Sequence, residues 1–234
     1  MTTTRQENQP MSELLTLEEL DTDGAIREAA DKVKGDTRAS FFGKAVLAGG
    51  AFAGGAALLG GLAEAAEGAT ATDIEILNFA LTLEYLELEF YSRALTRPTA
   101  LDGQTRRFAQ VVRTHEQTHV NAIKGVLGRA AVPKPTFDFK GTTENAAAFR
   151  KTAAVLERTG VRAYEGQAPR IEATAILKAA LAIHTVEARH SAWIRDIIGI
   201  NPAPVAFEQP LTMSQVLSAV AATGFIVSQP RFTG

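Results

Sequence analysis

Apolar residues recur every three to four positions through long stretches of this chain, and no stretch alternates between apolar and polar residues as a half-buried strand does. These stretches, with polar capping residues before them and Pro or Gly after them, predict long helices. Four are expected, at 72–97, 103–128, 142–168 and 170–199. The expected caps are Thr72 or Asp73 for the first helix and Thr142 or Thr143 for the third. A shorter helix is expected at 212–222, in a C-terminal extension (201–234) that packs on the others. The pattern therefore predicts an all-α fold.

The links between the predicted helices indicate how they are connected. The first and second helices, and likewise the third and fourth, are joined by short links, so each pair is expected to form an antiparallel hairpin. The link between the two hairpins, 129–141, contains Pro133 and Pro135. Extended at about 3.3 Å per residue, it would reach roughly 43 Å, which exceeds the length of about 39 Å expected for the second helix. This link can therefore cross the full length of a four-helix bundle over 67–200.

The chain begins with a polar leader, 1–44, and then changes character. Residues 45–63 carry no charge, with Lys44 before them and Ala63-Glu64-Ala65 at their end. An uncharged stretch that follows a basic residue and precedes an A-x-A-like site is typical of an export signal. We therefore expect an export signal or a membrane anchor over 45–66, and a protein exported to the periplasm or the cell surface.

Two observations refine the expectation for this segment. Thr37-Arg38-Ala39-Ser40-Phe41-Phe42 resembles a twin-arginine signal in which Ala39 replaces the second arginine. About 20 apolar residues can span a bilayer, so the stretch could also stay uncleaved and contact the membrane through 45–63. The remaining alternative is a buried helix rich in Gly and Ala.

The composition limits the partners and the metal ligands that this chain can have. The 24 Lys and Arg nearly balance the 26 Asp and Glu, giving a net charge of −2. Without a basic stripe, nucleic acid is not expected as a partner. The chain contains no cysteine, which excludes disulfides, thiolate metal sites and a cysteine nucleophile. Any bound metal must therefore be held by histidine and carboxylate side chains.

One pattern of Glu, Tyr and His occurs twice along the four predicted helices. The first and third helices carry a Glu followed by a Tyr seven residues later, which is about two turns and places both on one face. The second and fourth helices carry Glu-x-x-His, whose side chains lie about 60° apart and can face one point. The pairs are Glu84 and Tyr91, Glu116 and His119, Glu157 and Tyr164, and Glu187 and His190. Each half of the chain therefore offers the same set of donor groups.

Four glutamates on inward helix faces need positive charge beside them, because an unpaired carboxylate is costly to bury. Two divalent ions would balance four carboxylates and could also bind two neutral imidazoles. Each ion would then have one terminal Glu, one His and two bridging carboxylates. The sequence thus predicts a dinuclear metal site inside the bundle.

These motifs, over residues 72–227, make the chain similar to the bacterial ferritin-like domain family related to desiccation-associated proteins. The metal motif is similar to that of rubrerythrin, bacterioferritin and manganese catalase. The resemblance implies a ferritin-like four-helix bundle in which one metal ion is held by Glu84 and His119, and the other by Glu157 and His190. The bridging ligands would be Glu116 and Glu187. Tyr91 and Tyr164 would donate hydrogen bonds to the carboxylates.

A rival motif overlaps this pattern. His115, Glu116 and His119 match H-E-x-x-H, the signature of zinc proteases. In the extended form of that signature a Gly and a third His follow, where this chain has Ala122 and Gly125. A zinc hydrolase is therefore the less favoured alternative, and it would leave the second Glu-x-x-His without a role.

Four other polar residues lie near the pattern, and we expect each to have a structural or solvent-exposed role. Glu87 lies one turn after Glu84, and we expect it in a salt bridge at the rim, with an extra ligand as the alternative. Glu89 and Glu165 are expected in solvent. His184 lies about 120° around the helix from His190 and is expected in the core or at the surface.

Carboxylate-rich ligation favours iron or manganese over softer metals. We therefore expect two Fe or Mn ions that react with oxygen or a peroxide in stress protection, as a ferroxidase, a peroxidase or a manganese-catalase-like enzyme would. The alternative is a structural or desiccation-protective bundle whose metal only neutralises buried glutamates. The chain is also a candidate homo-oligomer.

Overall fold

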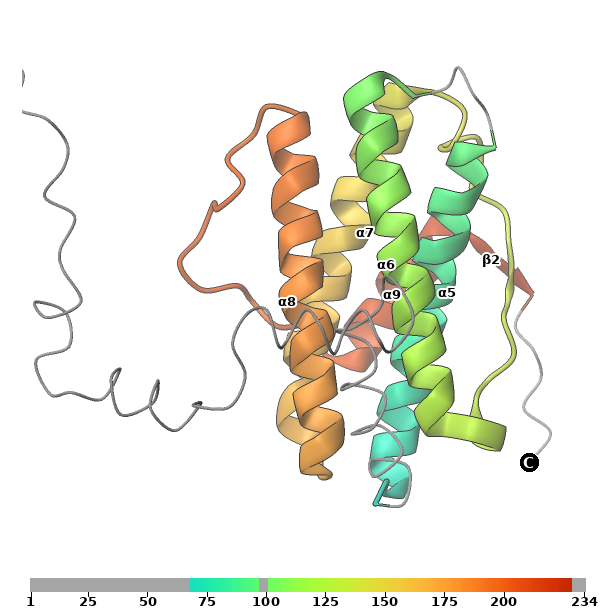
Figure 1. The fold of residues 1–234 in the computed structure, drawn as a ribbon, viewed down its shortest axis with the longest axis vertical. Coiled ribbons are helices and arrows are strands. Elements are labelled where there is room, and N and C mark those ends of the chain that lie inside the picture. Colours follow the sequence, from blue (N-terminus) through green and yellow to red (C-terminus); the bar gives the residue numbers. More distant parts are fainter. Residues whose placement is uncertain (1–67, 97–100, 229–234) are drawn as a thin grey trace, which may run out of the picture. The chain divides into compact units, whose positions relative to one another are not determined.

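The computed structural model describes residues 68–96 and 101–228, and the expected leader (1–44) and signal or anchor (45–66) lie outside them. Four long helices stand side by side in the described part (Figure 1). They are α5 (Ala71–Leu95), α6 (Gly103–Leu127), α7 (Ala146–Gln167) and α8 (Thr174–Ile197), followed by the shorter α9 (Met213–Thr223). The predicted all-α bundle is confirmed. No helix in this part of the chain is long and apolar enough to cross a membrane.

The four long helices form two hairpins, because α5 packs mainly on α6 and α7 mainly on α8. The link between α6 and α7 starts with a short 3-10 helix, η1 (Gly128–Ala130). From there it runs along the outside of the bundle to the start of α7 (Figure 1). As the chain length had indicated, this crossover spans the bundle from one end to the other.

Two helices begin about one turn later than the sequence predicted. Helix α7 starts after Asn145, whose side chain accepts a hydrogen bond from the Ala148 backbone N–H at 2.9 Å. Thr142, an expected cap, instead donates its hydroxyl to the Phe139 carbonyl at 2.7 Å. The periodic pattern runs on through this turn, so it could not mark where the helix begins.

Helix α8 starts at Thr174 because a side chain from α5 holds the residues before it. The Asp73 carboxylate accepts hydrogen bonds from the backbone N–H groups of Glu172, at 2.9 Å, and Ala173, at 3.2 Å. Asp73 also forms a capping box with Thr70, which is the N-cap of α5 in place of the expected Thr72 or Asp73. One buried aspartate thus caps its own helix and fixes the approach to another.

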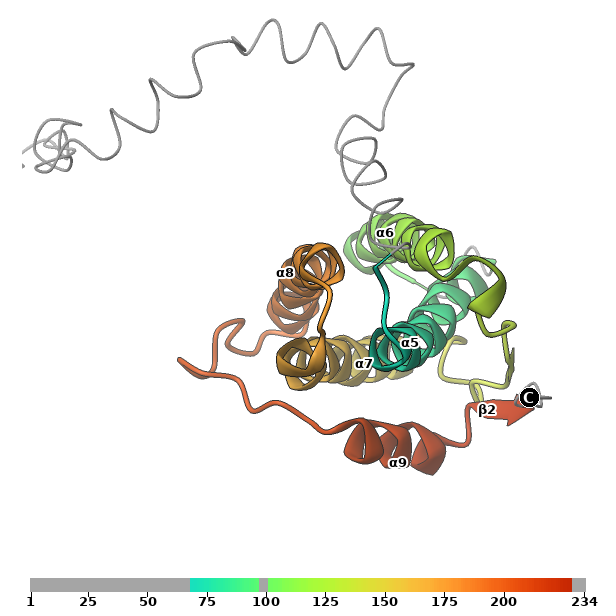
Figure 2. The ribbon, with the colours of Figure 1, turned by 90° about the horizontal axis from the view of Figure 1, so that it is seen from below.

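A small sheet, which the sequence did not predict, joins the crossover to the C-terminal segment. Strand β1 (Thr136–Phe137) pairs antiparallel with β2 (Ile226–Ser228). Strands this short carry no detectable alternation, so the expectation of no strands was wrong. Before β2, helix α9 lies against α7 (Figure 2) and buries Val216 and Val220.

The core divides into an aromatic part and an aliphatic part along the bundle. About two turns after Glu84 on α5, Phe90 stacks on Phe149 of α7 with ring centres 5.0 Å apart. About two turns before Glu84, Leu77 lies in an aliphatic region with Ile123 of α6. The polar residues between these two parts form the candidate site.

Candidate metal centre

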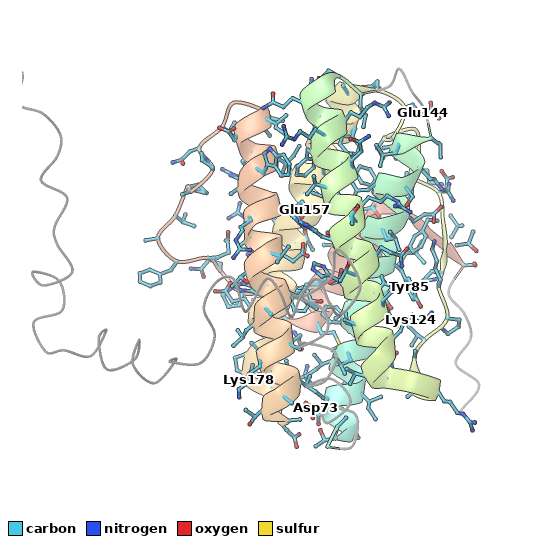
Figure 3. The ribbon with its side chains drawn as sticks, in the orientation of Figure 1. Asp73, Tyr85, Lys124, Glu144, Glu157 and Lys178 are labelled. Atoms are coloured by element: carbon cyan, nitrogen blue, oxygen red, sulfur yellow. The ribbon has the colours of Figure 1, made fainter. Side chains whose placement is uncertain are left out.

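Six side chains from the repeated pattern converge at the middle of the bundle. They are Glu84 on α5, Glu116 and His119 on α6, Glu157 on α7, and Glu187 and His190 on α8. Figure 3 shows Glu157 midway along the bundle, whereas Asp73 and Glu144 lie toward its two ends. All six are buried, and the most exposed, His119, shows 7% of its surface. Charged groups this deep need partners of opposite charge.

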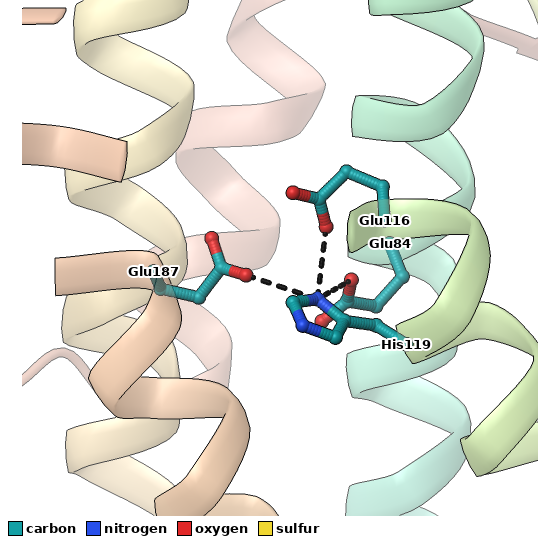
Figure 4. Close-up of side chains that lie close together, drawn as sticks. All are labelled: Glu84, Glu116, His119 and Glu187. Atoms are coloured by element: carbon teal, nitrogen blue, oxygen red, sulfur yellow. Dashed lines mark hydrogen bonds and ion pairs between the residues drawn. The ribbon is translucent and has the colours of Figure 1, made fainter. Parts of the chain in front are cut away.

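His119 stands at the centre of the first group of donor atoms. Its Nδ1 lies 3.2 Å from Glu84 Oε2 and 3.1 Å from Glu116 Oε2 (Figure 4). The same nitrogen lies 3.1 Å from Oε1 of Glu187, which comes from the other hairpin. Three carboxylates and one imidazole therefore face a single point.

His190 stands at the centre of the second group. Its Nδ1 lies 3.3 Å from Glu157 Oε2, 3.2 Å from Glu116 Oε1 and 3.6 Å from Glu187 Oε2. Glu116 and Glu187 thus turn one oxygen toward each histidine. This is the arrangement that carboxylates bridging two adjacent cations require.

The two tyrosines of the pattern donate hydrogen bonds to carboxylates, and they do so across the bundle. Tyr164 of α7 donates to Oε1 of Glu84 on α5, at 2.5 Å. Tyr91 of α5 donates to Oε1 of Glu157 on α7. In each glutamate the other oxygen, Oε2, faces a histidine. The tyrosines therefore fix the orientation of the two glutamates that each face a single histidine.

The charges in this cluster shift the acid–base equilibria of its members. Burial and the neighbouring Glu187 raise the pKa of Glu116 well above its usual range. Burial also raises the pKa of Glu157, to about 7. Burial disfavours charged His190, but the carboxylates around it outweigh this and raise its pKa to about 12. The pKa of His119 rises well above its usual value for the same reasons.

Glu187 shifts in the opposite direction. Burial alone would raise its pKa, but its contacts with His119 and His190 outweigh burial and lower the pKa to about 2. Without metal, the two imidazolium groups therefore supply the positive charge that the carboxylates need. Metal ions would have to displace these protons, because only neutral imidazole can coordinate.

Unpartnered atoms test whether the residues suit metal ions. Within the described ranges, six buried side-chain oxygen or nitrogen atoms lack a hydrogen-bond partner, and five belong to this cluster. They are Glu116 Oε1, Glu157 Oε2, both carboxylate oxygens of Glu187, and His190 Nδ1. Buried polar atoms are rarely left unpaired in native proteins. Two metal ions that displaced the imidazolium protons would give these five atoms partners, so the donor set fits two metal ions.

His115 contributes in a way that the sequence did not reveal. Its Nδ1 lies 2.8 Å from His190 Nε2, and the two rings stack with centres 5.1 Å apart. Burial and the charge of His190 lower the pKa of His115, so a neutral His115 accepts this hydrogen bond. Since His115 binds the outer nitrogen of His190, it does not share a metal-ligand group with His119 among the described residues. The geometry does not support the zinc-hydrolase alternative.

The structure corrects three expectations for neighbouring glutamates. Glu87 is not at the rim in a salt bridge: it is 4% exposed and forms no ion pair with any described residue. Glu89 is only partly in solvent, since it pairs with Arg93 at 2.8 Å and with Lys134 at 2.5 Å. One oxygen of Glu165 is buried rather than solvated. Helical periodicity shows which face of its own helix each residue occupies. It does not show whether another part of the protein covers that face.

A bundle of two hairpins joined by a long crossover, with four glutamates and two histidines at its centre, defines the class of ferritin-like proteins. The family model of the ferritin-like domain matches residues 72–200, and the chain belongs to this family. Protein rds1 of Schizosaccharomyces pombe is 26% identical over 165 residues, which make up 68% of this chain and 40% of that protein. The chain therefore spans less than half the length of this relative.

Proposed function

We propose that the chain binds two iron or manganese ions and uses them in redox chemistry with oxygen or a peroxide. The ligands would be Glu84, Glu116, His119, Glu157, Glu187 and His190. The observation that supports this proposal is the set of unpartnered oxygen and nitrogen atoms that face two adjacent points. Four carboxylates with two imidazoles favour iron or manganese over zinc or copper.

Bound iron or manganese would supply the reversible changes of oxidation state that such chemistry needs. The chain's own residues would hold and orient the ions. Glu116 and Glu187 would contribute to holding both ions, because each turns one oxygen toward His119 and the other toward His190. His115 holds the ring of His190 through its outer nitrogen, as hydrogen bonds to metal-binding histidines commonly do. Phe90 and Phe149 on one side, and Leu77 on the other, keep bulk water away.

A structural role for the metal is the second candidate, and one observation favours it. Every proposed ligand is at least nine-tenths buried, so the centre is closed to anything larger than small molecules in this conformation. In that case the ions would stabilise the bundle without turning over a substrate.

Metal content and peroxide consumption together test the proposal. Protein expressed with added iron or manganese should carry about two ions per chain, and the double variant Glu116→Ala/Glu187→Ala should carry none because both bridges are lost. Metal-free wild-type protein would refute the metal centre. A loaded protein that consumes neither oxygen nor peroxide would favour the structural role.

A further inference from the structure

Glu87 is a fifth buried carboxylate beside the four of the proposed centre. It lies one turn after Glu84 on α5 and is 4% exposed. Among residues 68–96 and 101–228, the charges that act on it are those of other carboxylates, which are Glu187, Glu157, Glu116 and Glu84. A carboxylate is seldom buried without a partner, because desolvation strongly disfavours its charge. A cation beside Glu87 would offset this cost.

The Glu87 carboxylate lies close to a glycine on the opposite hairpin. A Cβ atom placed on Gly160 of α7 would lie 3.3 Å from Glu87 Oε1 and 3.6 Å from Glu187 Oε2. The first distance is tighter than most real contacts of a Cβ atom, and the second is ordinary. The Glu87 carboxylate thus reaches across the bundle to α7, beside a carboxylate that faces both histidines.

The two halves of the internal repeat differ at the position of Glu87. Gly160 follows Glu157 by three residues, as Glu87 follows Glu84 by three. One half of the chain therefore has a glutamate where the other half has the glycine that gives it room. A side chain at position 160 would crowd the Glu87 carboxylate, because even its Cβ would lie 3.3 Å from Glu87 Oε1.

We propose that Glu87 is a fifth carboxylate ligand of the metal centre and makes its two ions inequivalent. This inference rests on the proposed function. Five carboxylates carry one negative charge more than two divalent ions can balance. The centre would therefore hold ions of higher charge more tightly than a four-carboxylate site does, which suits the oxidised states of iron or manganese.

Cobalt binding tests this without relying on activity, because the visible absorption of Co²⁺ depends on its ligands. Metal-free wild type, Glu87→Gln and the control Glu89→Gln would be titrated with Co²⁺ against a competing chelator. Glu87→Gln keeps the side-chain shape and removes the charge, and we expect one Co²⁺ to bind at least about tenfold more weakly, with a changed spectrum. Glu89→Gln, on the same helix but paired with Arg93 and Lys134, should match wild type.

The outcomes separate this inference from the proposed function. Wild type that binds no Co²⁺ would overturn both. Two ions in wild type, with unchanged affinity and spectrum in Glu87→Gln, would overturn only the role of Glu87. Should Glu87→Gln fail to fold, Gly160→Ala supplies the second measurement, because its Cβ crowds the Glu87 carboxylate. We then expect weaker Co²⁺ binding, and wild-type binding in Gly160→Ala would overturn the inference.

Discussion

The two oxygens of each central glutamate have different neighbours. In Glu84 and Glu157, Oε1 accepts a hydrogen bond from a tyrosine and Oε2 faces a histidine. In Glu116 and Glu187, each oxygen faces a different histidine. The two oxygens of one carboxylate therefore have different roles in the cluster. A tyrosine that holds one oxygen in place also determines the direction of the other.

Replacing Tyr164 with Phe should weaken metal binding without disturbing the fold. The change removes the donor to Glu84 Oε1, which leaves that oxygen buried and lets the carboxylate rotate. We expect the affinity for one ion to fall by about tenfold to 100-fold, the range for partners that orient metal ligands. Chelator competition measures this.

The third tyrosine offers the control. Tyr85 is also buried on α5 but has no hydrogen bond to the cluster in the described structure. Tyr85→Phe should therefore bind metal as wild type does. Equal affinities for all three proteins would show that the Tyr164 hydroxyl does not orient a ligand.

At the scale of helices and loops, packing depends on where the C-terminal segment meets α7. The Leu211 backbone N–H donates a hydrogen bond to the Arg162 carbonyl at 3.0 Å. This contact brings the Leu211 carbonyl against Gly166 on the same helix, so that a Cβ there would lie 1.9 Å from the carbonyl oxygen. Only glycine lets the backbone of the segment before α9 approach this closely.

Gly166→Ala should therefore destabilise the protein by about 1–3 kcal/mol, the usual cost of overpacking. The control is Gly125→Ala on α6, where an added Cβ meets nothing within 4 Å. That change should stabilise the helix by about 0.5–1 kcal/mol, since Ala is the better helix former. Urea denaturation of both variants measures the difference. A Gly166→Ala variant as stable as wild type would mean that α9 can move away from α7 at little cost.

The sequence predicted what a single helix determines and missed what depends on two elements. Periods of three and seven residues placed Glu116 with His119, and Glu84 with Tyr91, on common faces, because helix geometry alone sets those relations. The bond from His115 to His190 depends on how α6 and α8 are rotated against each other, and no periodicity contains that angle. The start of α8 depends on Asp73, about 100 residues earlier in the chain. Such contacts become visible only in three dimensions.

For the whole molecule, the metal-free cluster links stability to pH. The pKa values of Glu87 and Glu116 are raised, first by burial and then by Glu187, and those of His119 and His190 are raised by the surrounding carboxylates. The metal-free fold thus holds protons that the unfolded chain releases above about pH 4.5 for Glu and 6.5 for His. Its stability must fall as pH rises through this range. The lowered pKa of Glu187 makes stability rise with pH instead, but only below about pH 4.5.

Chelation should therefore lower the melting temperature more at pH 7.5 than at pH 5. At pH 5 the protonated cluster tolerates metal loss, and protons already compete with metal for the histidines. Scanning calorimetry of loaded and chelated protein at both pH values measures this. Equal melting temperatures with and without chelator would contradict a metal centre that neutralises the buried carboxylates.

Neither hairpin contains all six side chains of the candidate centre. The group around His119 takes Glu187 from the second hairpin, and the group around His190 takes Glu116 from the first. Assembling the centre is therefore the same event as docking one hairpin on the other. On two separate chains that event would be bimolecular and would depend on protein concentration. The crossover makes it unimolecular, because a tether of this kind holds its ends at effective concentrations of about a millimolar. The rate at which the centre forms should then be first order and independent of how dilute the protein is.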